Sequence, residues 1–263
     1  MTRPALRIRN EFEFQDLVDS LERAPELVVR DFALMVVAAK LVDTHGDALC
    51  FKGGFVLRHV YGHERFSKDI DATRVNPPKH KLDAEAVRTA IDAASMSNLL
   101  TVRAEPPATD SKRGLDFERI AFRGPVGEGS IAIEVSYREE VILGPKWEAV
   151  GPPYFEPFDL PVMHLDEIVA EKLRTLAQRT RPTDLADLAQ ILADHQVDAD
   201  TVARLVDQKF QLVKRGNRSE RIKENILAIG RDYESVVRAV APDAPDYETA
   251  RSRVLAALPR FLP

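Results

Sequence analysis

The chain has 263 residues, 44% of them hydrophobic and 30% charged, and this balance is that of a folded protein with one large or two small domains rather than of a disordered chain. Basic residues number 37 and acidic residues 42, so the net charge of −5 gives no general sign of nucleic-acid binding, and any basic surface has to be local. Cys50 is the single cysteine, which excludes an internal disulfide and a multi-cysteine zinc site.

The N-terminal region lacks the pattern of a signal peptide or a membrane-spanning segment. Residues 1–14 alternate charged and apolar side chains. The longest apolar run, residues 32–42, contains Lys40 and is shorter than the roughly 20 residues that a membrane span requires. We therefore expect a soluble, cytoplasmic protein with no membrane partner.

The pattern of apolar residues, glycines and prolines predicts alternating helices and strands in the first part of the chain. In chain order these are helices over residues 11–23 and 26–45, a strand over 48–51, a short helix over 55–61, a strand over 66–73, a helix over 83–94, and strands over 99–104, 115–122 and 130–137. From about residue 165 the pattern is helical to the end, and a proline-rich connection over residues 151–161 marks the change. We therefore predict a mixed α/β domain over residues 1–155 and a helical domain over residues 156–263.

Residues 51–71 combine two features that suit phosphate and metal chemistry. Gly53 and Gly54 lie at a predicted strand-to-helix junction, where the backbone can approach a ligand closely and the N–H groups attract phosphate. Asp69 and Asp71 lie on a predicted strand with one residue between them, so both carboxylates face the same side, about 7 Å apart along the chain, and could hold a divalent cation. A glycine pair alone is usually a turn, and an isolated Asp-x-Asp is usually a solvated strand edge, but their combination in this order favours a site.

The glycine pair, the short helix and the segment Arg65-x-Ser67-x-Asp69-Ile70-Asp71 together resemble the first motif of the AbiEii-type nucleotidyltransferases. These are toxins of type IV toxin–antitoxin pairs within the DNA polymerase β superfamily, and they include the MenT toxins. The resemblance implies an α/β fold, with a polymerase β-like nucleotidyltransferase core and a mixed sheet, followed by an all-α C-terminal part.

The resemblance also assigns roles to the residues of this motif. Asp69 and Asp71 would be catalytic and would bind the metal ion, whereas Gly53, Gly54 and Ser67 would bind the nucleotide.

Glu134, in the predicted strand over residues 130–137, is a candidate third metal ligand, because the resemblance places this strand beside the Asp-x-Asp strand. It alternates with Ile133 and Val135, so it faces away from the apolar side and could meet the two aspartates across neighbouring strands. A glutamate on an exposed strand face requires no function, so the alternative of a solvated side chain stays open.

Lys172 lies within an apolar helix face. On a predicted helix over residues 165–179, one stripe contains Leu165, Ile168, Val169, Leu173 and Leu176. Lys172 falls inside this stripe, where an ammonium group is costly unless an anion meets it, and Arg179 leans to the same side. The resemblance assigns this lysine to the triphosphate. Alternatively, its aliphatic stem lies along the stripe and the ammonium group reaches water.

Residues 181–188 resemble the Arg-Asp-x-x-Asp-Leu motif of the family, in which Asp184 would belong to the catalytic centre. Asp184 and Asp187 lie in the first turn of a predicted helix, one turn apart. Acids in that turn also complement the helix dipole, which is an explanation without catalysis.

Two positions depart from the family pattern. Thr183 stands where arginine is common, which weakens the match of the last motif. Phe55 replaces the usual small hydroxyl residue after the glycine pair, so one side-chain contact to phosphate would be missing and backbone donors would have to serve.

Residues 208–223 form the local basic cluster of the chain. It contains Lys209, Lys214, Arg215, Arg218, Arg221 and Lys223 against one acid, Glu220. The first four of these cations are the predicted RNA contacts, because such a cluster could bind a phosphate backbone. An amphipathic helix with a solvated basic face would explain the cluster equally well.

Together these features predict a nucleotidyltransferase that uses a nucleoside triphosphate and Mg²⁺ or Mn²⁺. Through the resemblance, we expect it to add nucleotides, as pyrimidines, to the 3′ end of tRNA, to block aminoacylation and translation, and to be restrained by a cognate antitoxin. Two other classes of function stay open: transfer to a protein or small molecule, and a non-catalytic module that binds a partner.

Overall fold

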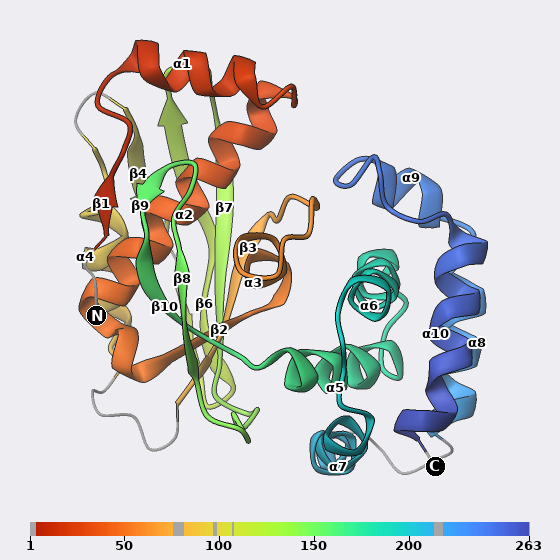
Figure 1. Ribbon diagram of the computed structural model, residues 1–263. Coiled ribbons are helices and arrows are strands. Elements are labelled where there is room, and N and C mark those ends of the chain that lie inside the picture. The colour runs from red at the N-terminus through yellow and green to blue at the C-terminus, as the bar shows by residue number, and fades with distance from the viewer. Residues whose placement is uncertain (1–3, 76–81, 97–98, 107, 213–217, 263) are drawn as a thin grey trace. The chain divides into compact units, whose positions relative to one another are not determined.

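The structure is a computed structural model that describes residues 4–75, 82–96, 99–106, 108–212 and 218–262. It contains two compact units (Figure 1), one comprising Met1–Gly62 with Phe66–Met163 and the other His63–Arg65 with His164–Pro263. The first unit combines helices with a mixed sheet, and the elements described in the second are helices. The predicted α/β fold with an all-α C-terminal part is therefore confirmed.

The first unit is built on an eight-stranded mixed sheet with the order β4-β6-β7-β3-β2-β10-β8, in which β5 also pairs with β6. Its strands are β2 (Leu49–Lys52), β3 (Asp69–Arg74), β4 (Thr101–Ala104), β5 (Thr109–Asp110), β6 (Gly114–Gly124), β7 (Gly127–Ser136), β8 (Lys146–Val150) and β10 (Phe158–Val162). β3 is parallel to β7, and β10 is parallel to β2, whereas the other pairs are antiparallel. A separate short pair joins β1 (Ala5–Leu6) to β9 (Phe155–Glu156).

Three of the described helices of the first unit begin where the sequence supplies a side-chain cap or a proline. The helices of this unit are α1 (Glu11–Ser20), α2 (Pro25–His45), the 3₁₀ turn η1 (Gly46–Ala48), α3 (Gly53–His59) and α4 (Ala84–Asp92). Asn10 and Asp83 accept backbone N–H bonds at the starts of α1 and α4, and Pro25 occupies the first turn of α2, where its missing N–H costs nothing.

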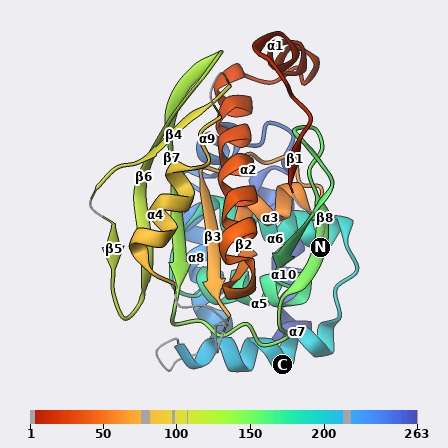
Figure 2. The same ribbon diagram turned by 90° about the vertical axis from the view of Figure 1, so that its left-hand side faces the viewer.

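The sheet has one apolar and one polar face because side chains alternate along its central strands. On β7, Ile131, Ile133 and Val135 are buried, whereas Ser130 and Glu134 are exposed. The buried face packs against α2, which contacts β7, β3 and β6 and which Figure 2 shows running along the sheet. The opposite face of β3, β6 and β7 therefore carries the polar residues.

The proline-rich segment predicted as a connection contains two strands, β9 and β10. Val162 of β10 pairs with Phe51 in a parallel register, and Pro161 lies opposite Trp147 of β8. This pairing extends the first unit to Met163, whereas the sequence suggested a boundary after residue 155. Sequence pattern could not reveal these strands because their partners lie elsewhere in the chain.

The second unit is a set of packed helices. They are α5 (Leu165–Leu176), α6 (Pro182–Asp194), α7 (Ala199–Lys209), the 3₁₀ turn η2 (Phe210–Leu212), α8 (Arg218–Ile229), α9 (Tyr233–Arg238) and α10 (Tyr247–Phe261). Ile168, Val169, Leu173 and Leu176 of α5 are buried, as the predicted stripe requires. Among the described helices, none has both the length and the apolar character needed to cross a membrane.

Candidate functional site

Asp69 and Asp71 share the polar face of the sheet. Ile70 between them is fully buried, whereas both aspartates are partly exposed, so the alternation expected of this strand is present in β3. The Oγ atom of Ser67 lies 3.0 Å from the backbone oxygen of Asp69 and 3.0 Å from its Oδ1 atom. Ser67 is itself buried, so its hydroxyl group orients the first carboxylate of the pair.

Gly53 makes room for the second carboxylate. Its φ of +72° is in the left-handed region, and a Cβ atom at this position would lie 2.2 Å from Oδ2 and 3.0 Å from Cγ of Asp71. Residue 53 must therefore be glycine for two reasons: its backbone has a positive φ, and a side chain there would clash with Asp71. The carboxylate of Asp71 lies against the turn that opens α3, and Gly54, the second glycine, is buried in that turn.

Helix α3 is fixed to α2 by a buried carboxylate. Arg58 and His59 donate to Oδ1 of Asp31 over 3.0 and 3.1 Å, and the hydroxyl group of Tyr154 donates to its Oδ2 over 3.0 Å. Burial alone would raise the pKa of Asp31, but the neighbouring His59 and Arg58 lower it, so the carboxylate is charged. These bonds hold the helix that begins at Gly53.

Phe55, the residue that departs from the family pattern, has a packing role. Its side chain is fully buried, and its ring lies 4.7 Å from the ring of His59 and 6.4 Å from that of Phe51. The position after the glycine pair therefore belongs to the core.

The strand register places three carboxylates in one row. Asp71 of β3 lies opposite Glu134 of β7, and Glu134 lies opposite Asp116 of β6. Residues that are paired in neighbouring strands project to the same side, with Cα atoms about 5 Å apart. Burial of Asp116 and the nearby Glu118 raise its pKa, and Arg138 acts in the opposite direction. Asp116 was not predicted from the sequence, because only the register of β6 shows that it continues the row.

This set of oxygen donors is suited to magnesium. Asp69 and Asp71 supply two carboxylates, and Mg²⁺ usually takes one or two carboxylates and completes its octahedron with water and substrate phosphate. Within the described residues, no three His, Cys, Asp or Glu side chains are gathered as a complete metal site. Glu134 is thus the neighbour of Asp71 across the strands, and its predicted role as a third ligand stays a prediction.

In the second unit, Lys172 lies at the centre of an ion-pair cluster. Its ammonium group donates to Oδ1 of Asp184 and to Oδ2 of Asp187, each over 2.8 Å. Arg179 donates to the other oxygen of Asp184 over 2.8 Å, and Arg65 makes two bonds of 2.7 and 3.0 Å to Asp187. We call these five residues the α5–α6 ion cluster.

The α5–α6 ion cluster keeps its members charged. Burial alone would lower the pKa of Lys172, but Asp184 and Asp187 outweigh it and raise that pKa. Burial would likewise raise the pKa of both aspartates. Lys172 and Arg179 hold the pKa of Asp184 well below its usual range, and Arg65 and Lys172 lower that of Asp187.

The anions beside Lys172 in the apolar stripe are Asp184 and Asp187. The lysine side chain is 11% exposed, and two carboxylates of the same unit lie beside it. An ammonium group has three N–H donors, so one stays without a partner among the described residues. The pairing of Arg65 with Asp187 was not predicted, because the two residues are far apart in the sequence.

The predicted RNA contact at Lys209 needs correction. Its side chain is only 2% exposed, and its ammonium group lies 2.7 Å from Glu167 and 3.0 Å from Glu171. Lys209 therefore joins α7 to α5 in the interior, which a basic stretch of sequence does not reveal. Arg218 pairs with Asp207 over 2.7 Å at the surface.

The two remaining predicted RNA contacts, Lys214 and Arg215, lie outside the described residues.

A protein-family model and solved structures match the chain. The family model described as "Nucleotidyl transferase AbiEii toxin, Type IV TA system" matches residues 38–260. Among solved structures, the chain is similar to MenT4, a nucleotidyltransferase toxin of Mycobacterium tuberculosis H37Rv, with a TM-score of 0.69 and 23% identity over 94% of this chain and 88% of that one. It is also similar to JHP933 from Helicobacter pylori, with a TM-score of 0.60 and 17% identity over 90% and 93% of the two chains. No curated protein matches the sequence.

Proposed function

The chain belongs to the AbiEii family of nucleotidyltransferase toxins from type IV toxin–antitoxin systems, and from this premise we propose that it adds pyrimidine nucleotides to the 3′ end of tRNA with a divalent metal ion. A tRNA with an altered 3′ end cannot be aminoacylated, so translation would stop. The reaction would take place in the cytoplasm, where tRNA and nucleoside triphosphates are present, and a cognate antitoxin would restrain it.

The main support for the proposal is the position of the Asp71 carboxylate against Gly53. The carboxylate lies beside a turn whose backbone is free of side-chain bulk, on the sheet face that also carries Asp69. A triphosphate that reaches this turn would therefore meet both backbone N–H donors and the carboxylates that bind its counter-ion.

The residues of this face have separate tasks in the proposed reaction. Asp69 and Asp71 would hold Mg²⁺ or Mn²⁺, with Glu134 as a third candidate ligand, and Ser67 keeps Asp69 in position. When bound, the ion neutralises the charge on the phosphates and makes an attacking hydroxyl group more acidic. The turn at Gly53 would orient the phosphates through its backbone.

The chemical step is a transfer of the nucleotidyl group. The 3′ hydroxyl oxygen of the acceptor forms a bond to the α-phosphorus, the bond between that phosphorus and the β-phosphate oxygen breaks, and pyrophosphate leaves. The hydroxyl proton passes to a nearby carboxylate or to water.

Lys172 and Asp184 are proposed to act in the same reaction, as the family resemblance implies. The remaining N–H donor of Lys172 is the group that could bind a phosphate oxygen, because the other two are directed to carboxylates. Asp184 would then act by holding the ammonium group in place and charged.

Labelled nucleotide transfer tests the proposal. The purified protein is incubated with total RNA and each α-labelled triphosphate in turn, with Mg²⁺ or Mn²⁺, and compared with Asp71→Asn and Lys172→Ala. We expect labelled tRNA with the wild type and a pyrimidine triphosphate, and a loss of at least about 100-fold in the Asp71→Asn variant.

Other products would contradict the proposal. Label that survives RNase and disappears on proteolysis would identify a protein as the acceptor. Transfer by Asp71→Asn at the wild-type rate would exclude the carboxylate face as the catalytic site, and no transfer under any condition would favour a partner-binding role.

A further inference from the structure

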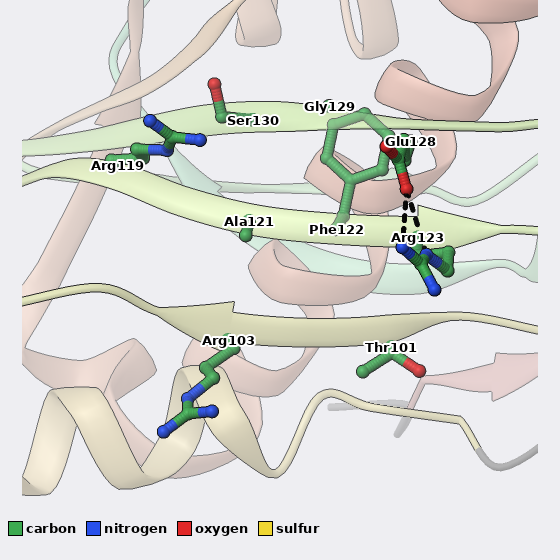
Figure 3. Close-up of a pocket in the computed structure, with 9 residues that line it drawn as sticks. All are labelled: Thr101, Arg103, Arg119, Ala121, Phe122, Arg123, Glu128, Gly129 and Ser130. Carbon is green, nitrogen blue, oxygen red and sulfur yellow. Dashed lines mark hydrogen bonds and ion pairs between the residues drawn. The ribbon is translucent and has the colours of Figure 1, made fainter.

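A cavity of about 430 Å³ lies on the first unit, over the end of the sheet formed by β4, β6 and β7 (Figure 3). It is lined by Thr101, Arg103, Arg119, Ala121, Phe122, Arg123, Glu128, Gly129 and Ser130. Three arginines against a single glutamate make it a basic site in a chain of net negative charge. We call Arg103, Arg119 and Arg123 the arginine surface.

The arginine surface lies on the same face of the sheet as Asp69 and Asp71. On β7, Ser130, Ala132 and Glu134 project to one side, and Ala132 and Glu134 are the register partners of the two aspartates. Ser130 pairs with Ala121, and Ala121 pairs with Arg103. The cavity and the carboxylates are therefore two ends of one polar face, separated by about 13 Å along β7 between residues 130 and 134.

An irregularity in β6 adds the third arginine to this face. The register shifts between Phe117 and Ile120, both of which are buried. Glu118 and Arg119 therefore form a bulge, in which two residues lie where a regular strand would have one. Both side chains are exposed as a result. A regular strand would have buried one residue of the pair.

The spacing of the arginines suits a polymer of phosphates better than a single small anion. Arg119 and Arg123 are about 13 Å apart along β6, too far for one phosphate group to contact both. Figure 3 shows Arg103 projecting from the neighbouring strand β4, so the guanidinium groups are spread over two adjacent strands rather than directed at one point. A nucleic-acid backbone presents repeated phosphates to such a surface.

The arginines are available to a ligand. Arg119 pairs with Glu105 over 2.9 Å and Arg123 pairs with Glu128 over 2.8 Å, but these side chains are 68% and 77% exposed. Exposed pairs contribute little stability, so phosphate can replace the carboxylate at low cost. Within the described part of the chain, Arg103 has no ion-pair partner.

We propose that the arginine surface binds the phosphate backbone of the RNA acceptor and directs its 3′ end along the sheet to Asp69 and Asp71. The inference rests on the proposed nucleotidyl transfer and names the surface that recognises its acceptor. It places that surface in the first unit, whereas the basic cluster of residues 208–223 belongs to the second.

RNA binding without triphosphate or metal tests this inference separately from catalysis. The dissociation constant of the full chain for a 5′-labelled tRNA is measured by fluorescence anisotropy at several salt concentrations. The variant carries Arg103→Ala, Arg119→Ala and Arg123→Ala, and the control carries Arg9→Ala, Arg204→Ala and Arg231→Ala, which remove the same charge from exposed positions elsewhere.

We expect the arginine-surface variant to bind tRNA at least about tenfold more weakly than the control, with a salt dependence reduced by about two ions. A second variant, Glu128→Gln, removes the competitor of Arg123 and should bind tRNA several-fold more tightly. This gain does not depend on the triple variant folding well. In transfer assays, the triple variant should show a raised KM for tRNA with little change in kcat.

Equal affinity and salt dependence in the triple variant and the control would overturn the inference, as would a wild type that binds no RNA. Unchanged tRNA binding with lost binding of an acidic protein partner would assign the surface to that partner instead. Failure of the proposed function is a different result: RNA binding that depends on the arginines, with no nucleotide transfer.

Discussion

The carboxylate of Asp71 occupies the space that a side chain at Gly53 would need, with Oδ2 only 2.2 Å from the position of a Cβ atom. The glycine is the first residue of α3 and the aspartate lies in β3, and each limits what the other can be. This relationship explains why α3 begins with a glycine, and it makes the position of the carboxylate testable through the glycine.

Gly53→Ala should displace Asp71 and lower nucleotide transfer at least about 100-fold, because a misplaced metal ligand costs far more than the backbone strain of about 1 kcal/mol. The matched control is Gly144→Ala, since Gly144 has a φ of +76° with no atom within 4 Å of its Cβ position. Initial rates and thermal unfolding are measured for both. Equal losses of activity would mean that strain alone, and not the clash with Asp71, is responsible.

Ser67→Ala should weaken metal binding, because its Oγ atom lies 3.0 Å from Oδ1 of Asp69. Groups that orient a metal ligand typically contribute 10- to 100-fold, so we expect transfer to require about tenfold more Mg²⁺. Titration of activity with Mg²⁺ measures this. Ser20→Ala removes an exposed hydroxyl that donates to the backbone oxygen of Leu17, and it should leave the titration unchanged. An unaltered Mg²⁺ requirement in Ser67→Ala would refute the orienting role.

Asp187→Asn should destabilise the second unit by about 3 kcal/mol, because it leaves the partly buried Lys172 and Arg65 with one carboxylate fewer. Denaturant unfolding followed by circular dichroism gives the change. Glu248→Gln breaks the exposed pair with Arg251 and should have no measurable effect. A similarly small effect at Asp187 would show that the buried cluster does not stabilise the helices.

The lowered pKa values of Asp184 and Asp187 predict the pH dependence of stability. Because each pKa is lower in the folded protein than in the unfolded chain, the stabilisation is fully present above about pH 4 and is lost as the pH falls towards the folded pKa. Lys172 has a raised pKa, so its contribution persists up to about pH 10 and is lost above it.

Unfolding free energies measured from pH 2 to pH 7 check the acidic side of this dependence. Each proton taken up on unfolding contributes a slope of about 1.4 kcal/mol per pH unit, so Asp187→Asn should make the acid limb shallower by up to one such proton. A wild type and variant with the same slope below pH 4 would contradict the lowered pKa of Asp187.

Local sequence patterns were sufficient for part of the site. The alternation of Asp69, Ile70 and Asp71 depends only on the period of a strand, and the structure has both aspartates on the polar face. The position of Lys172 within an apolar helix stripe favoured an anion beside it over an ammonium group that reaches water. Both inferences concern residues a few positions apart, whose geometry the backbone alone determines.

Contacts between distant segments were decided by the tertiary structure. Asp184 and Asp187 are the anions beside Lys172, Glu167 and Glu171 bury Lys209, and an irregularity in β6 exposes Arg119. No local pattern encodes these, because they depend on strand register and helix packing over long separations. The sequence by itself thus determined which side chains share one face of a strand or helix. The tertiary structure decided which charged groups lie together, because a buried charge requires an opposite charge beside it, and that partner can come from a distant part of the chain.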